Sequence, residues 1–290
     1  MTTPSTTPDA AAPPRETGSL AVIRRRVRDA IPAVWRRRLR RWAREGPVRL
    51  TDAIPDAFDL LRGTANRLPP PRLRARVSLS SSRREFERAG ALAAADVLRA
   101  FEICRRPGRP YARWLDFGCG VGRVTRHVAR SGSAVELHGV DVDADAIRWL
   151  AASHPPGRFV ACGRLPPANV PASSFDVVYA VSVFTHFDET MESAWLEELD
   201  RLLCPGGLLI ASTLSTVLTF TRPDLTVEQH REMNQRGFLF APGGGTFNDD
   251  AAFEARSRVE RVWGKKLTPR LFEEQGLAGY QDLSVWEKPG

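Results

Sequence analysis

A glycine-rich turn directly after a short apolar strand constrains this chain more than any other feature. Residues 115–123 read Leu-Asp-Phe-Gly-Cys-Gly-Val-Gly-Arg. Glycines in such a turn permit positive φ angles and let a ligand approach the backbone closely. The dinucleotide fingerprint Gly-x-Gly-x-x-Gly/Ala does not fit, because Arg123 takes its last position. Asp116, ahead of the turn, would repel a diphosphate and attract an ammonium group. The turn therefore predicts a ligand with a cationic end.

A second acid follows at the spacing expected for a ribose contact. Asp141 ends the predicted strand 135–140 and lies about 20 residues after Gly118. A carboxylate in this place accepts hydrogen bonds from ribose hydroxyls in nucleotide-binding α/β sheets. The two segments together predict a site for a nucleoside that carries an amino-acid end.

The order of elements predicts a parallel sheet. Strands and helices alternate along the middle of the chain, which is typical of βαβ units with helices on both faces. We expect strands at 113–117, 135–140, 159–161, 175–181 and 208–213, and helices at 122–130, 143–152 and 188–203. Asp188 is the expected N-cap of the last helix, and Ser82 with Glu85 predicts the cap of an earlier one.

These features resemble one known family, the class I S-adenosylmethionine-dependent methyltransferases of the small-molecule branch. The resemblance covers about residues 84–213, including Phe184-Thr185-His186, and extends more weakly to the C-terminus. It implies a Rossmann-like α/β fold with a seven-stranded, mostly parallel sheet, helices on both faces, an N-terminal helical extension and an insertion before the last strands. The final strand is antiparallel in the family, and residues 278–286 suit it. The implied cofactor is S-adenosyl-L-methionine.

The resemblance also implies which residues bind the cofactor. Asp116 and the glycine turn would hold the methionine end, Asp141 the ribose and Val142 the adenine. The full implied set is Asp116, Gly118, Cys119, Gly120, Arg123, Asp141, Val142, Cys162, Gly163 and Val181. Many relatives have Asp or Asn near the adenine amino group, whereas this chain has Cys162. Backbone groups must therefore make more of the contacts that recognise the adenine.

The acceptor side is less defined. A hydroxyl acceptor needs a base, and His186 is the candidate, although a histidine that starts a helix also bonds backbone or touches cofactor. Residues 214–265 are the expected acceptor-binding insertion, with His230 and Phe238 as candidate contacts and glycines 243–245 as either a lid or a plain loop.

We expect O-methylation of a small molecule, a sugar or a secondary metabolite. Residues 180–183 lack the Asn/Asp-Pro-Pro-Tyr/Phe motif of DNA-base and glutamine N-methyltransferases. Three alternatives stay open: N-methylation of a small-molecule amine, a nicotinamide-dependent oxidoreductase, and a non-catalytic cofactor-binding or membrane-associated partner protein.

Charge separates the N-terminal segment from the rest. The chain has 42 Lys and Arg against 34 Asp and Glu. Residues 1–50 hold twelve Arg and four acids, which accounts for the whole net charge of +8. The remainder of the chain has no net charge, which argues against general binding of nucleic acid by its folded part. We expect a disordered tail at 1–18, a basic helical extension with a Pro-rich linker at 19–80, and the methyltransferase domain at 81–290.

The basic segment 20–45 carries apolar residues at helical spacing between its arginines. It is interpreted either as a packed helix with a solvated face or as a peripheral contact with a membrane or polyanion. The four cysteines form no Cys-x-x-Cys pair, so we expect neither a metal nor disulfides. With no long apolar run or signal sequence, the expected location is cytoplasmic, and no oligomeric state is predicted.

Overall fold

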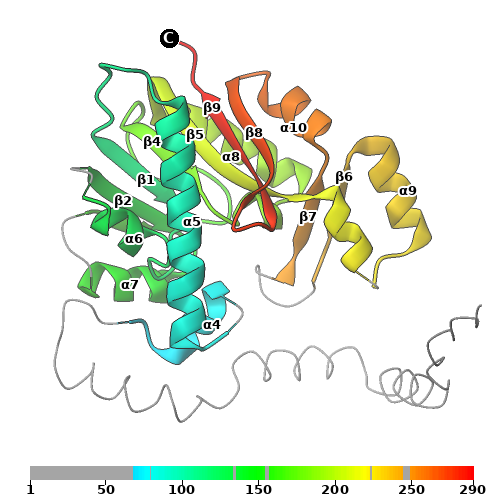
Figure 1. Cartoon of the computed structure of the whole chain (residues 1–290), viewed down its shortest axis with the longest axis horizontal. Helices are drawn as coiled ribbons and strands as arrows, with labels where there is room; N and C mark the ends of the chain where they lie inside the picture. The colour runs from blue at the N-terminus through cyan, green and yellow to red at the C-terminus, as the bar shows by residue number, and fades with distance from the viewer. Residues whose placement is uncertain (1–67, 79, 133–134, 154–156, 223, 244–248) are drawn as a thin grey trace, which may run out of the picture. The chain divides into compact units, whose positions relative to one another are not determined.

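The computed structural model describes residues 68–290 apart from 79, 133–134, 154–156, 223 and 244–248 (Figure 1). The expectations for the tail at 1–18 and the basic segment 20–45 lie outside the described residues. The helices are α4 (Pro71–Ser78), α5 (Arg83–Cys104), α6 (Thr125–Arg130), α7 (Ala144–Ser153), α8 (Glu189–Leu202), α9 (Val227–Arg236) and α10 (Arg256–Trp263), with 3-10 turns η1 (Phe184–His186) and η2 (Thr216–Thr221). The strands are β1 (Arg113–Phe117), β2 (Glu136–Asp141), β3 (Phe159–Ala161), β4 (Phe175–Ala180), β5 (Leu203–Ser215), β6 (Phe238–Ala241), β7 (Ala251–Glu254), β8 (Thr268–Leu277) and β9 (Gln281–Glu287).

The central sheet is mostly parallel, as predicted. Strands β3, β2, β1, β4 and β5 are parallel neighbours in that order. The last strand, β9, runs antiparallel to β5, and β8 pairs antiparallel with β9. The family resemblance implies seven strands, whereas the described sheet has nine, because β7 of the insertion pairs with the end of β5 and β6 pairs with β7.

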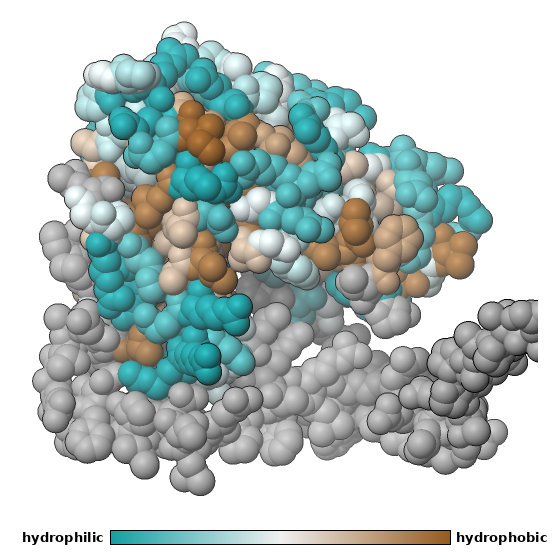
Figure 2. Space-filling view, in the orientation of Figure 1, coloured by the Kyte–Doolittle hydropathy of each residue, from teal (hydrophilic) through white to brown (hydrophobic). Residues whose placement is uncertain are grey.

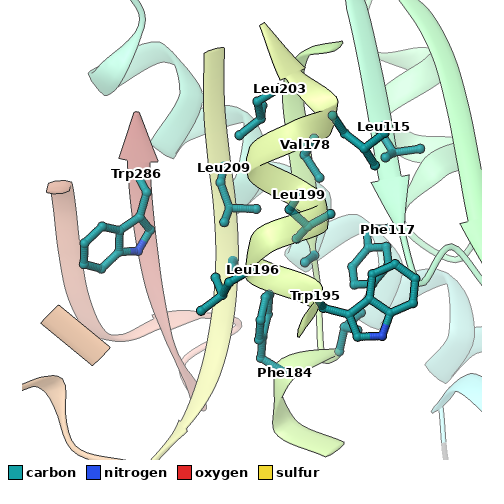
Figure 3. Packing of buried hydrophobic residues seen from close by; sticks show 14 of the residues in the cluster. Leu115, Phe117, Val178, Phe184, Trp195, Leu196, Leu199, Leu203, Leu209 and Trp286 are labelled. Atoms are coloured by element: carbon teal, nitrogen blue, oxygen red, sulfur yellow. The ribbon is translucent and has the colours of Figure 1, made fainter. Parts of the chain in front are cut away.

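Alternate residues of each strand supply two hydrophobic cores, one on each face of the sheet. Leu115 and Val178 point into the core under α8, while their neighbours Trp114 and Val177 point into the core under α5. In the first core the ring of Trp195 lies 4.7 Å from that of Phe117 (Figure 3). Helices therefore cover both faces, which confirms the predicted α/β architecture (Figure 1).

Local capping signals place the helix starts. Ser82 Oγ accepts from the backbone N–H of Glu85, and Asp188 caps α8 through the N–H of Met191, as expected. The segment assigned to a Pro-rich linker instead forms α4, which begins at Pro71 because proline suits the first helical position. The helix expected at 122–130 begins only at Thr125, because a turn follows the glycine loop.

The insertion sits at the carboxyl end of β5. Strand β7 pairs with β5 at two positions, Leu214 with Phe253 and Ser215 with Glu254, and β6 pairs antiparallel with β7. Figure 2 shows brown, apolar residues exposed between teal ones on the side that carries α9. The insertion has its own small core, made of Leu214, Met233, Leu239, Ala241, Ala251 and Phe253. Among the described helices, none combines the length and apolar character needed to cross a bilayer.

Candidate active site

The glycine loop joins β1 to α6 at the carboxyl edge of the sheet. Gly118 and Gly120 have φ angles of 78° and 52°, a region that favours glycine. A Cβ on Gly118 would lie 2.3 Å from Cγ2 of Val183, so the loop lies directly against the turn that follows β4. The backbone N–H groups of Gly118 and Cys119 donate to the carbonyl of Val140 on β2, which fixes the loop beside that strand.

Asp141 lies where β2 ends, beside this loop. Its Oδ2 accepts from the backbone N–H of Gly120 at 2.7 Å, and its Oδ1 accepts from that of Asp143 at 2.7 Å. Burial raises the pKa of Asp141, and these backbone hydrogen bonds oppose part of the rise. The structure thus brings the two strongest sequence predictions, the loop and the second acid, into direct contact.

Asp116 lies deeper than its predicted role suggests. Its side chain is buried and its Oδ2 accepts from the Thr125 hydroxyl at 2.6 Å. Burial raises the pKa of Asp116 to about 7, and the hydroxyls of Thr125 and Tyr179 oppose part of the rise. In this position Asp116 braces the loop against α6, so a direct contact with the methionine end stays a prediction.

The other predicted cofactor residues divide between core and edge. The Cys119 side chain is buried with Ile147 and Leu150, so only its backbone belongs to the loop edge. Val142 is 40% exposed directly after Asp141. The remaining members are placed as follows: Val181 is buried, Arg123 and Cys162 are half-buried, and Gly163 is exposed.

The turn after β4 holds a strained residue that the sequence did not single out. Ser182 has a φ of 59°, which is uncommon for a residue with a side chain. Its backbone N–H donates to Oγ of Ser212 at 2.8 Å, and its hydroxyl accepts from the Gln281 amide at 2.9 Å. Strands β5 and β9 therefore hold this turn in place, and backbone strain of this kind clusters at functional sites.

His186 ends the η1 turn and contacts the insertion. Its Nδ1 lies 2.7 Å from the carbonyl oxygen of Asp250, which can only accept, so Nδ1 carries the proton in the neutral ring. Burial lowers the pKa of His186, and the Asp250 carbonyl and the nearby carboxylates of Asp250 and Asp249 oppose part of this shift. The imidazole is therefore neutral at pH 7.

Thr185 stands out beside His186. Its side chain is 2% exposed, and within the described residues its hydroxyl has no hydrogen-bond partner. An unpaired buried hydroxyl costs free energy, so such a group near a site is a candidate ligand contact.

A buried charge cluster ties the insertion to α8. Arg258 forms ion pairs with Glu192 and Glu254, and the Nε1 of Trp263 donates to Glu192 at 2.7 Å. Burial raises the pKa of Glu254 well above its ordinary value, and the nearby Glu192 carboxylate adds to the rise. The hairpin β6–β7 is thereby anchored at both ends, at Glu254 by this cluster and at Asp250 by His186.

The two acceptor candidates of the insertion lie in different environments. Phe238 is buried under the Arg258 guanidinium, whose central carbon lies 4.1 Å from the ring centroid, so it packs the insertion and its contact with an acceptor stays a prediction. His230 stacks on Phe220, whose side chain is 82% exposed, with 5.9 Å between the ring centroids. Among the described residues, no cluster of His, Cys, Asp and Glu has a metal-binding arrangement.

The strand order, the loop and Asp141 define a nucleoside-binding α/β domain of the Rossmann-like class. Residues 115–209 match the family model described as "Methyltransferase domain". The match runs from β1 into β5, which includes the loop, Asp141 and η1.

Curated relatives match a similar share of the chain. The ubiquinone biosynthesis O-methyltransferase of Parvibaculum lavamentivorans is 30% identical over 121 residues, 41% of this chain and 47% of that protein. The malonyl-[acyl-carrier protein] O-methyltransferase of Enterobacter lignolyticus is 32% identical over 123 residues, 42% of this chain and 45% of that protein. The chain thus spans about half the length of these relatives.

The Burkholderia thailandensis 1,6-didemethyltoxoflavin-N1-methyltransferase, solved with 1,6-didemethyltoxoflavin and S-adenosylhomocysteine, gives a TM-score of 0.49 at 17% identity, covering 71% of this chain and 82% of that one. The family match assigns residues 115–209 to a methyltransferase domain, in agreement with the S-adenosylmethionine-dependent class that the sequence resembles. S-adenosyl-L-methionine is the cofactor of this class, and the donor set here fits it. Asp141 offers a carboxylate to sugar hydroxyls, and within the described residues it accepts only from backbone N–H groups.

Proposed function

We propose that this protein transfers the methyl group of S-adenosylmethionine to a hydroxyl group of a small molecule, a sugar or secondary metabolite, with His186 as general base. The observation that carries the proposal is the bond between Nδ1 of His186 and the Asp250 carbonyl, 2.7 Å long. It assigns the proton of the neutral ring to Nδ1, which makes Nε2 the basic nitrogen. Because burial lowers the pKa of His186, the ring is in its basic form at pH 7.

The position of η1 supports this role. Val183, three residues before His186, lies against Gly118, so the turn with the histidine and the loop assigned to the cofactor meet at one edge of the sheet. Two anchored turns at one edge suit a reaction in which alignment supplies much of the rate enhancement.

When bound, the cofactor supplies a methyl group activated by the adjacent sulfonium. The residues of the chain do the rest. Asp141 would hold the ribose hydroxyls, the loop at Gly118 and Gly120 would hold the amino-acid end, and the buried side chains of the η1 turn would exclude water. His186 takes the proton from the acceptor hydroxyl at Nε2.

Exposed apolar side chains of the insertion favour an acceptor with a ring or a large apolar surface. The exposed Phe220 ring, backed by His230, offers a flat face, and Val217 and Val227 near it in the chain are 56% and 71% exposed. Apolar side chains that remain exposed at the edge of a site suit a partner of the same character. One relative is named as a malonyl-[acyl-carrier protein] O-methyltransferase. A carboxylate acceptor would need no general base, so the test of the proposal includes one.

A transfer assay tests the proposal. The full chain is given methyl-labelled S-adenosylmethionine and matched acceptors that present a hydroxyl, an amine or a carboxylate on the same ring. We expect label only on the hydroxyl acceptor, and loss of that transfer in His186→Gln. Equal transfer to the carboxylate by both proteins, or to the amine, would reject the O-directed mechanism.

A cytoplasmic location and a peripheral contact through residues 20–45 stay predictions. Sedimentation with liposomes, comparing the full chain with one that starts at residue 51, tests the latter.

A further inference from the structure

Helix α4 packs on the glycine loop, outside the segment that matches the methyltransferase family. A Cβ on Gly120 would lie 2.7 Å from Cγ1 of Val77, so helix and loop are in direct contact. Val77 and Leu73 pack in one cluster with Val121 of the loop and Ala146 of α7. In Figure 1, α4 lies at the N-terminal end of α5. Helix α4 thus borders the edge of the sheet where Asp141 lies.

Arg76 anchors α4 to this edge. Its Nη1 lies 2.6 Å from Oδ2 of Asp143, and its Nη2 lies 3.7 Å from Oδ2 of Asp145. The side chains of Arg76 and Asp143 are 27% and 28% exposed, so solvent screens the pair only in part.

Asp143 connects this ion pair to the ribose-binding acid. Its Oδ1 accepts from the backbone N–H of Ala146 at 3.2 Å, which fixes the start of α7. Its own backbone N–H donates to Oδ1 of Asp141 at 2.7 Å. A chain of contacts therefore runs from Arg76 through Asp143 to Asp141.

We propose that Arg76 is a positioning residue for the cofactor, because it holds α4 as the outer wall of the S-adenosylmethionine site through Asp143. The inference rests on the proposed function. A wall at this place excludes water from Asp141 and so strengthens the hydrogen bonds that its carboxylate makes to a sugar. A cofactor that contacts the closed wall also stabilises α4 in place.

The chain offers a matched control on the same helix. Arg72 lies one turn before Arg76 and is exposed. The experiment measures the Kd of S-adenosylhomocysteine by calorimetry for the full chain, Arg76→Ala, Arg76→Lys and Arg72→Ala. We expect Arg76→Ala to raise Kd about fivefold, the effect of one partly exposed ion pair. Arg76→Lys recovers part of the affinity, and Arg72→Ala binds as the wild type does.

Hydrogen exchange distinguishes a positioning role of Arg76 from a purely structural one, because a structural role predicts no effect of the ligand on α4. Saturating S-adenosylhomocysteine should slow amide exchange across residues 71–78 in the wild type and Arg72→Ala, and have a weaker effect in Arg76→Ala. Should Arg76→Ala fail to fold, Arg76→Gln carries the same comparison.

Three results would overturn the inference: equal Kd values for Arg76→Ala and the wild type, tighter binding by Arg76→Ala, or unchanged exchange at 71–78 in a saturated wild type. Tighter binding would mean that α4 obstructs the site. A wild type that binds no S-adenosylhomocysteine would instead refute the proposed function, so the two failures are distinguishable.

Discussion

The Nδ1 atom of His186 and the carbonyl oxygen of Asp250, 2.7 Å apart, join the turn after β4 to the β6–β7 hairpin. The Asp250 carboxylate also accepts from the backbone N–H of Gly243 at 2.9 Å, which closes the loop of that hairpin. One residue of the insertion therefore shapes its own loop and orients the imidazole. Under the proposed function, the same contact would set the position of His186 relative to an acceptor bound at the hairpin.

Replacing His186 by Gln should lower kcat by about 10²–10⁴-fold, the usual contribution of a general base. The wild-type rate should fall as the pH drops through the pKa of His186, which burial places below its ordinary value, because the protonated ring accepts no proton. Steady-state rates across pH 5 to 9 test both. A His186→Gln profile with the same acidic limb as the wild type contradicts the assignment.

Asp141→Ala should raise the Kd of S-adenosylhomocysteine about 10- to 100-fold, since hydrogen bonds to a charged group are lost. The matched control is Asp224→Ala, which removes an exposed acid of the insertion that pairs with Arg222. Calorimetry on both variants decides the matter. Equal affinities in Asp141→Ala and the control would remove the ribose assignment.

Asp116→Asn should change how stability depends on pH. The pKa of Asp116 is raised to about 7 in the folded chain, so its contribution to stability is complete below the unfolded value near 4 and is lost as the pH rises through 7. The neutral amide removes this loss. Chemical denaturation measures the free energy of unfolding. Between pH 5 and pH 8 this free energy should rise in Asp116→Asn relative to the wild type by roughly a few kcal/mol. The same dependence on pH in both proteins would disprove the raised pKa.

Arg258→Ala should destabilise the fold by about 3–5 kcal/mol, because it leaves Glu192 and Glu254 buried without their cation. Arg256→Ala is the control on the same helix, since Arg256 forms an exposed pair with Glu260 and should cost less than about 1 kcal/mol. Urea denaturation measures both. Similar losses in the two variants would show that the buried cluster does not anchor the insertion.

Thr185→Val should leave the ligand-free chain as stable as the wild type, because the hydroxyl has no partner among the described residues. If this hydroxyl contacts cofactor or acceptor, the same variant loses affinity for one of them. Melting temperatures with and without S-adenosylhomocysteine, together with KM for the acceptor, separate these effects. A variant that melts several degrees lower without ligand would mean that the hydroxyl serves the fold.

Local signals carried most of what could be predicted. The glycine loop, Asp141 and the Asp188 cap depend on neighbours within a few residues or on the fixed order of βαβ units, so their placement followed from spacing. The Pro-rich segment could have been recognised as a helix start from Pro71, and Thr226 with Gln229 as the capping box that begins α9.

The remaining site features depend on contacts between distant segments. Ser182 is strained because Ser212 and Gln281 hold it from two other strands. Phe238 packs under Arg258 because β6 folds back on α10, which no local pattern indicates. Such residues become visible only when the chain is folded.

The insertion joins β5 through two paired residues on each strand and keeps a small core apart from the two main ones. Met233 and Leu239 belong to this small core and to neither main core, whereas Val259 and Trp263 of α10 join the core under α8. If residues 214–265 bind the acceptor, as proposed, mutations in this small core can alter acceptor binding while the central sheet keeps its packing. A scaffold of this kind could then acquire new substrates without a change in its fold.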